Sequence, residues 1–210
     1  MAAPTPLTAI ALSCTLKASP ADSSTDLLCQ QILDALAEHD VEGTLIRVVD
    51  HDVRPGVSSD EGDGDAWPAI RQEILDADIL VLGTPIWLGQ PSSVCKRVLE
   101  RMDAFISETD DGGRLVSMDK VAVLATVGNE DGAHAVAAAT YQALSDVGFT
   151  IPANGQAYWV GEAMGSTDYQ DLDAPPEKVV ETVIDVARNA AHLARLLQAD
   201  PYPAGESGEG

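Results

Sequence analysis

Short apolar runs of strand length alternate with longer segments of helical period along almost the whole chain. The run 79–82, Ile-Leu-Val-Leu, is apolar at every position, which is typical of a strand buried on both faces. Strict alternation of strands and helices predicts a parallel β-sheet with helices on both faces and right-handed crossovers. The expected strands are 7–12, 44–49, 79–82, 120–126 and 157–160, and the expected helices are 25–38, 67–75, 91–106, 132–146 and 177–197.

Length and composition predict one domain. The chain has 210 residues, of which 45% are hydrophobic, and this is enough for one core of ordinary size. We expect residues 1–198 to form that domain and residues 199–210, rich in Gly, Pro and Glu, to be a disordered acidic tail. The inward face of the last helix is expected to carry Val180, Val183, Ile184, Ala187, Ala191 and Ala194.

The chain is strongly acidic, with a formal net charge of −22 and only four lysines. A field of this sign repels nucleic acid and anionic membrane surfaces, so neither is expected as a partner. No apolar run approaches the roughly 18 residues that a membrane helix needs. Two explanations of the acidity stay open: a solubilising surface suited to a salty cytoplasm, or a face that docks a basic electron-transfer partner.

Three cysteines are present, Cys14, Cys29 and Cys95, and they are widely spaced without a CxxC motif. This pattern gives neither a disulfide framework nor a ligand set for zinc or an iron–sulfur cluster, so no metal site is expected. The first residues carry no basic segment of a secretory signal. Together these features favour a cytoplasmic protein.

The segment that follows the 79–82 run predicts a ligand site. It reads Gly-Thr-Pro-Ile-Trp-Leu-Gly-Gln-Pro-Ser-Ser and leads into a helical pattern that carries Lys96, Arg97 and Arg101. Ligands of open α/β sheets lie outside the carboxyl ends of the strands. A rigid loop that bears Trp87 at such a place predicts a planar cofactor. The three basic residues are expected either to attract an anionic nicotinamide or to form a solvated helix face.

The loop after the first strand, residues 13–26, is a candidate phosphate site. It is rich in hydroxyl groups, carries Lys17 and leads into a helix, whose first turn offers unpaired N–H groups and a partial positive charge. It is neither a P-loop nor a GxGxxG fingerprint. Asp22 and Asp26 would repel a phosphate unless they point outward.

These segments, with residues 126–132 (Thr-Val-Gly-Asn-Glu-Asp-Gly), resemble the flavodoxin-like superfamily, and above all its NAD(P)H-dependent FMN reductases. The resemblance covers nearly the whole chain. It implies a three-layer α/β/α fold with a five-stranded parallel sheet of order 2-1-3-4-5, and FMN bound beside the first and third strands. The sequence departs from the family in its first loop, where Ser-Cys-Thr-Leu-Lys replaces the Gly-Ser-x-Arg start that is common in the reductases.

The resemblance also implies the binding residues. Trp87 is expected to pack on the flavin ring, with a core or dimer-interface position as the alternative. Glu130 and Asp131 either form a solvated turn or disfavour an anionic reduced flavin, and His134 is a surface residue or a proton donor. The implied residues are Ser13, Lys17, Ser19, Ser23, Ser24 and Thr25 around the phosphate, Pro85, Ile86, Trp87, Leu88 and Gly89 along the ring, and Thr126, Gly128, Asn129 and Gly132 on the other side.

A bound flavin carries its own redox chemistry, so no catalytic side chain is expected. The expected function is an FMN-dependent oxidoreductase that takes electrons from NADH or NADPH and reduces a flavin, a quinone or a similar small acceptor. The resemblance further implies a homodimer or a higher homo-oligomer. Two alternatives stay open: an electron carrier like flavodoxin with no nicotinamide activity, and a binding module that has lost its cofactor. Loops 51–65 and 161–176 are expected to set acceptor specificity.

Overall fold

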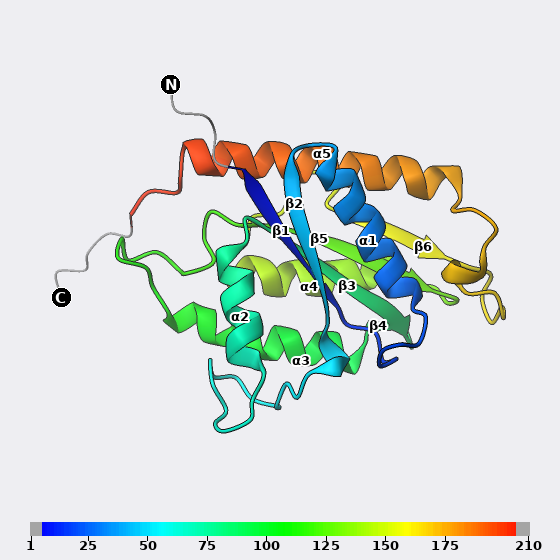
Figure 1. Ribbon diagram of the computed structural model, residues 1–210, viewed down its shortest axis with the longest axis horizontal. Helices are drawn as coiled ribbons and strands as arrows, with labels where there is room; N and C mark the ends of the chain where they lie inside the picture. Colours follow the sequence, from blue (N-terminus) through cyan, green and yellow to red (C-terminus); the bar gives the residue numbers. More distant parts are fainter. Residues whose placement is uncertain (1–5, 205–210) are drawn as a thin grey trace.

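The computed structural model describes residues 6–204. A parallel β-sheet lies at the centre of the fold, with helices on both of its faces (Figure 1). The strands are β1 (Leu7–Ser13), β2 (Val41–Arg47), β3 (Ile79–Trp87), β4 (Gln90–Pro91), β5 (Val121–Gly128) and β6 (Gln156–Val160). The α-helices are α1 (Ser24–Ala37), α2 (Trp67–Asp76), α3 (Ser93–Met102), α4 (Ala133–Asp146) and α5 (Glu177–Ala199), and short 3-10 turns lie at η1 (Val48–Asp50), η2 (Asp103–Ser107) and η3 (Tyr169–Asp171).

The sheet has the order β2-β1-β3-β5-β6, and its neighbouring strands are parallel. Numbered without the two-residue β4, the five long strands follow the expected order 2-1-3-4-5, which confirms the predicted fold class. The strand order reverses between β1 and β3, where a ligand crevice opens in sheets of this kind. The short β4 pairs antiparallel with the tip of β3.

Two cores lie on the two faces of the sheet. Ile79 and Val81 of β3 pack in one core with α1 and α5, whereas Leu80 and Leu82 pack in the other with α2, α3 and α4 (Figure 1). Successive side chains of a strand point to opposite faces, so a strand covered on both faces is apolar at every position. This is the physical reason for the unbroken apolar run in the sequence.

Strand β3 extends five residues beyond the predicted end at residue 82. Thr84 and Pro85 stay paired with Thr126 and Val127 of β5, and the tip of β3 turns back through β4. The segment that the sequence placed in a loop therefore begins as a strand. Its side chains are aimed by the sheet, which holds them more rigidly than a loop would.

Gly83 of β3 lets α1 approach the sheet closely. A Cβ atom at this position would lie 2.2 Å from Sγ of Cys29 and 3.1 Å from Cγ2 of Thr25, both on α1. Real Cβ contacts are longer than this, so only glycine fits between the strand and the helix. The close approach brings the first turn of α1 against the carboxyl end of the sheet.

The start of β2 and the buried face of α5 also differ from the predictions. Strand β2 begins at Val41 and not at residue 44, because it pairs along the full length of β1, starting with Leu7 opposite Val41. On α5, Val180 and Ile184 are exposed, although they were expected to face inward. The buried stripe of α5 runs through Val179, Val183, Val186, Ala187, Ala190, Ala191, Ala194 and Leu197.

Arg101 of α3 is buried, although it was expected to lie on a basic helix face or to meet a nicotinamide. Its guanidinium donates hydrogen bonds to Oδ2 of Asp65 (2.7 Å) and to the carbonyls of Ser58 (3.0 Å) and Arg54 (2.9 Å). The side chains of Arg101 and Asp65 are fully buried. This ion pair ties the acidic 51–65 segment to α3, so the segment is an anchored loop of the fold.

Residues 200–204 lie against the body of the protein. The amide of Tyr202 donates to Oδ1 of Asp119 (2.8 Å), and its carbonyl accepts a hydrogen bond from Arg114 (2.9 Å). The rest of the predicted disordered tail, 205–210, lies outside the described residues. Within the described residues no helix is long and apolar enough to cross a membrane.

Candidate functional site

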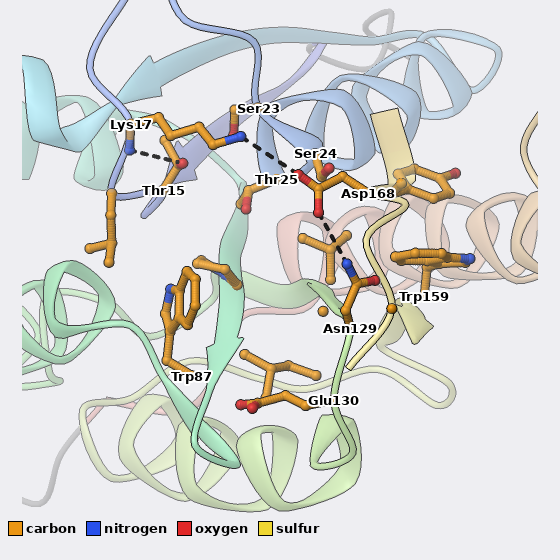
Figure 2. A pocket seen from close by; sticks show the side chains of 17 residues that line it. Thr15, Lys17, Ser23, Ser24, Thr25, Trp87, Asn129, Glu130, Trp159 and Asp168 are labelled. Carbon is orange, nitrogen blue, oxygen red and sulfur yellow. Dashed lines mark hydrogen bonds and ion pairs between the residues drawn. The ribbon is translucent and has the colours of Figure 1, made fainter. Parts of the chain in front are cut away.

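A pocket of about 330 Å³ opens at the carboxyl ends of β1, β3 and β5 (Figure 2). This is where the strand order reverses, the usual ligand position of an open α/β sheet. The pocket combines the β1–α1 loop, the tip of β3, the β5–α4 loop and the segment that follows β6. Its lining residues are Thr15, Leu16, Lys17, Ser23, Ser24, Thr25, Pro85, Ile86, Trp87, Val127, Gly128, Asn129, Glu130, Trp159, Gly165, Asp168 and Tyr169.

One end of the pocket is suited to an anion. Ser23 caps α1, and its hydroxyl accepts a hydrogen bond from the amide of Asp26 at 3.3 Å. Ser24 and Thr25 form the first turn of the helix, where backbone N–H groups have no acceptor within the helix. Lys17 adds a positive charge beside them (Figure 2). Helix amides, hydroxyl groups and an ammonium together form a site for phosphate.

Asp26, which was expected to repel a phosphate unless it pointed outward, is paired with Arg47 of β2. Its Oδ2 accepts hydrogen bonds from Nε (2.8 Å) and Nη2 of Arg47, and its Oδ1 accepts one from the hydroxyl of Ser13. Arg47 also donates to the carbonyl of Ala21 at 2.8 Å. The guanidinium thus fixes the β1–α1 loop and neutralises the carboxylate of Asp26. Asp22 is exposed and does not line the pocket.

Asp168, which was not among the predicted site residues, places a carboxylate in the pocket. Asp168 lies between Lys17 and Asn129, with Ser24 and Thr25 beside it (Figure 2). Its Oδ2 is 3.7 Å from Nζ of Lys17, and its Oδ1 accepts a hydrogen bond from Nδ2 of Asn129 at 3.1 Å. The anion end therefore already contains one negative side chain.

The other end of the pocket is apolar and aromatic. Pro85 and Ile86 come from β3, Val127 and Gly128 from β5, and Trp87 stands at the mouth with 55% of its surface exposed. The exposure rules out a core role for Trp87 within this chain. A flat ring system fits between such walls, and contacts with an indole favour aromatic ligands.

Two loops meet tightly at the mouth. The amide of Gly89 donates to Oε1 of Glu130 at 3.0 Å, and a Cβ on Gly132 would lie 2.9 Å from Cα of Gly89. Glu130 is therefore a half-buried side chain that lines the pocket, and not a solvated turn residue. Since the Gly89 amide is already bonded to Glu130, it does not offer a free donor to a ligand.

Nine of the fifteen predicted binding residues line the pocket: Lys17, Ser23, Ser24, Thr25, Pro85, Ile86, Trp87, Gly128 and Asn129. The other six lie outside it for local reasons. Ser13 and Thr126 are buried, with their hydroxyls bonded to Asp26 and Gln156, and Ser19 is bonded to Asp50. Leu88, Gly89 and Gly132 lie beyond the lining, with Leu88 91% exposed.

The structure adds eight lining residues that were not among those predicted: Thr15, Leu16, Val127, Glu130, Trp159, Gly165, Asp168 and Tyr169. Trp159 lies in β6, and Tyr169 packs on it with ring centroids 5.5 Å apart. Burial raises the pKa of Tyr169, whereas the hydrogen bond of its phenol to Gln31 lowers it. This neutral phenol anchors η3 to α1.

The pocket fits a phosphorylated flavin. The anion end and the flat apolar end lie in one cavity, as the phosphate and the ring of such a molecule require. Asn129 supplies a further polar group: its Oδ1 is buried and has no hydrogen-bond partner among the described residues. A buried acceptor of this kind is costly unless a ligand or water satisfies it.

Comparisons with known proteins agree with this geometry. The sequence model of the NADPH-dependent FMN reductases matches residues 10–164. The 8-demethyl-8-aminoriboflavin-5'-phosphate synthase of Streptomyces davaonensis is 33% identical over 209 residues, which cover 93% of this chain and 80% of that protein. A divalent metal cation transporter, MntH, of Mycobacterium bovis is 37% identical over 200 residues. The chain spans only 29% of that transporter's length, so the similarity concerns a part of it.

Two solved structures place the fold among flavoproteins. RosB, with the bound intermediate 8-demethyl-8-formylriboflavin-5'-phosphate, superposes with a TM-score of 0.84 at 32% identity, over 93% of this chain and 82% of RosB. The apo form of an NADH:FMN oxidoreductase, EmoB, superposes with a TM-score of 0.63 at 19% identity, over 94% of both chains. The second likeness supports the fold alone.

Proposed function

The chain belongs to the NADPH-dependent FMN reductase family, and from this premise we propose that it is an oxidoreductase that binds FMN in the pocket between Lys17 and Trp87. NADH or NADPH is the proposed electron donor, and a small molecule such as a flavin or a quinone is the proposed acceptor. One observation supports the proposal above all. A single pocket, placed where the strand order of the sheet reverses, has one end suited to an anion and another that is flat and aromatic.

Different residues of the pocket bind the phosphate and the ring of FMN. The first turn of α1, with Ser24, Thr25 and Lys17, holds the phosphate by N–H groups, hydroxyls and charge. Trp87 covers one face of the ring and leaves an open mouth through which a nicotinamide can reach it. FMN, when bound, supplies the hydride and electron chemistry, so the pocket needs no nucleophile or acid–base pair.

A second candidate function treats the flavin phosphate as the substrate. The relative from Streptomyces is named for a product with an amino group at flavin position 8, and the RosB structure contains an intermediate with a formyl group there. The TM-score of 0.84 and the 32% identity to RosB favour this candidate. In this case the chain oxidises the methyl group at position 8 of FMN to the formyl level, with molecular oxygen as the oxidant and water as the by-product, and releases the modified flavin.

An anaerobic absorption experiment, followed by mass spectrometry of the recovered flavin, separates these functions. For the oxidoreductase we expect bound FMN to lose its visible absorption on addition of NADH or NADPH, and to be recovered with unchanged mass after turnover with an acceptor. Bound FMN that neither nicotinamide bleaches would instead support a carrier like flavodoxin. A changed flavin mass after aerobic incubation would support the second candidate.

A further inference from the structure

Asp168 places a negative charge where the proposed phosphate binds. Its carboxylate lines the same end of the pocket as Lys17, Ser24 and Thr25, and lies 3.7 Å from the Lys17 ammonium. Asn129 donates a second contact at 3.1 Å. A carboxylate and a phosphate beside one ammonium repel each other, so they compete for Lys17.

We propose that Asp168 is an internal counter-anion of the phosphate end, and that a flavin phosphate binds by replacing its carboxylate beside Lys17. The inference rests on the proposed function. It makes Asp168 a specificity-determining residue: the side chain lowers the preference of the pocket for a phosphorylated over a non-phosphorylated flavin and keeps FMN exchangeable.

The ion pair between Lys17 and Asp168 is weak enough for a phosphate to replace the carboxylate. The side chains of Lys17 and Asp168 are 49% and 45% exposed, and ion pairs exposed to this extent are weak because water and salt compete with them. A phosphate at the same place gains the amides of the first turn of α1 as well as the ammonium. The phosphate therefore has more donors available to it than the carboxylate that it replaces.

The backbone around Asp168 is held independently of that pair. The amide of Gln170 donates to the hydroxyl of Ser24 at 3.2 Å, and the phenol of Tyr169 donates to Oε1 of Gln31 at 2.7 Å. The amide of Asp171 donates to the backbone carbonyl of Asp168 at 3.0 Å. An asparagine keeps this backbone contact, so Asp168→Asn removes the charge and leaves the segment anchored.

The test is a pair of equilibrium titrations, with FMN and with riboflavin, on the wild type, Asp168→Asn and Asp173→Asn. Riboflavin lacks the phosphate and reports the ring end alone. We expect Asp168→Asn to lower the Kd of FMN at least fivefold and to change the Kd of riboflavin less than twofold. Asp173 is exposed in the same segment, so Asp173→Asn controls for net charge and is expected to change neither Kd.

The outcomes separate this inference from the function on which it rests. An Asp168→Asn variant that binds riboflavin normally, but FMN no tighter than the wild type does, overturns the inference alone. Equal shifts for both flavins also overturn it, since they show a structural role for Asp168. A wild type that binds neither flavin overturns the proposed function and this inference together.

Discussion

In the proposed function, Lys17 is the residue on which we expect phosphate binding to depend most. Of the four lysines, all of them within the described residues, it alone lines the pocket. We expect Lys17→Gln to weaken FMN binding about tenfold, equivalent to about 1.4 kcal/mol, and to leave riboflavin binding unchanged. The value lies at the low end for a charged hydrogen bond because the ammonium is half-exposed and shared with Asp168.

Isothermal titration calorimetry with the two flavins measures this difference. Lys96→Gln is the matched control, because Lys96 is exposed on α3, away from the pocket lining, and pairs with Glu100 of the same helix at 3.8 Å. An equal loss of FMN affinity in both variants would show that Lys17 acts through the overall charge and not at the phosphate.

The pocket-lining residues that could be predicted from the sequence are those that carry a local pattern. Lys17, Ser23 and Ser24 belong to a hydroxyl-rich loop before a helix, and such a loop is visible in one stretch of chain. Trp159 and Asp168 carry no such pattern, because only the packing of β6 beside β5 brings their segment over the pocket. Distant partners of this kind follow from tertiary structure, and no spacing in the sequence encodes them.

At the scale of elements, the contact between β3 and α1 depends on Gly83. In Gly83→Ala the new methyl group meets Sγ of Cys29, so we expect a loss of about 1–3 kcal/mol in the free energy of unfolding. Urea unfolding measures it. The double variant with Cys29→Ala removes the clashing sulfur and is expected to be less destabilised than the sum of the two single variants. Strict additivity would contradict the proposed clash.

The Arg101–Asp65 pair anchors the 51–65 segment and makes stability depend on pH. Burial alone would raise the pKa of Asp65, but hydrogen bonds from Arg101 and from backbone amides lower it overall. A carboxyl with a lowered pKa stabilises the fold above its ordinary pKa of 3.8, and this contribution is lost as the pH falls below that value. Asp65→Asn should therefore lose stability at neutral pH and show a shallower further loss in acid.

Denaturant unfolding at about pH 7, 5 and 3 measures both effects. Asp65→Asn leaves the Arg101 guanidinium without its charged partner, which costs about 3–5 kcal/mol for a buried pair. The matched control is Asp63→Asn, an exposed residue of the same segment, which should follow the wild-type curve. A parallel pH dependence in Asp65→Asn and the wild type would show that Asp65 does not carry the effect.

The order of the elements could be predicted from the sequence, whereas several of their ends could not. Buried strands and amphipathic helices alternate visibly, and chain order with right-handed crossovers limits how they assemble. The start of β2 and the end of β3 are set by pairing with β1 and β5. They therefore depend on neighbouring strands and cannot be predicted from the local sequence. The helical pattern alone predicts that Arg101 is exposed to solvent. It is buried because the 51–65 segment packs over it.

At the scale of the whole molecule, the charge of −22 opposes anionic substrates. NADPH carries one phosphate more than NADH, so it is repelled more strongly. We expect the KM for NADPH to fall several-fold when salt rises from about 0.05 M to about 0.5 M, with a smaller fall for NADH, because screening shortens the range of repulsion. Steady-state rates with an uncharged acceptor measure this. A KM that rises with salt would instead indicate local attraction by basic residues.

The proposed function requires that this pocket binds FMN, with its phosphate at the first turn of α1 and its ring beside Trp87. A crystal structure of the protein grown with FMN tests the claim most directly. We predict the phosphate within hydrogen-bond distance of the amides of Ser24 and Thr25, the Lys17 ammonium turned toward it, and the flavin ring against Trp87. A flavin bound elsewhere, or with its phosphate pointing away from α1, would show that this pocket does not bind FMN as proposed.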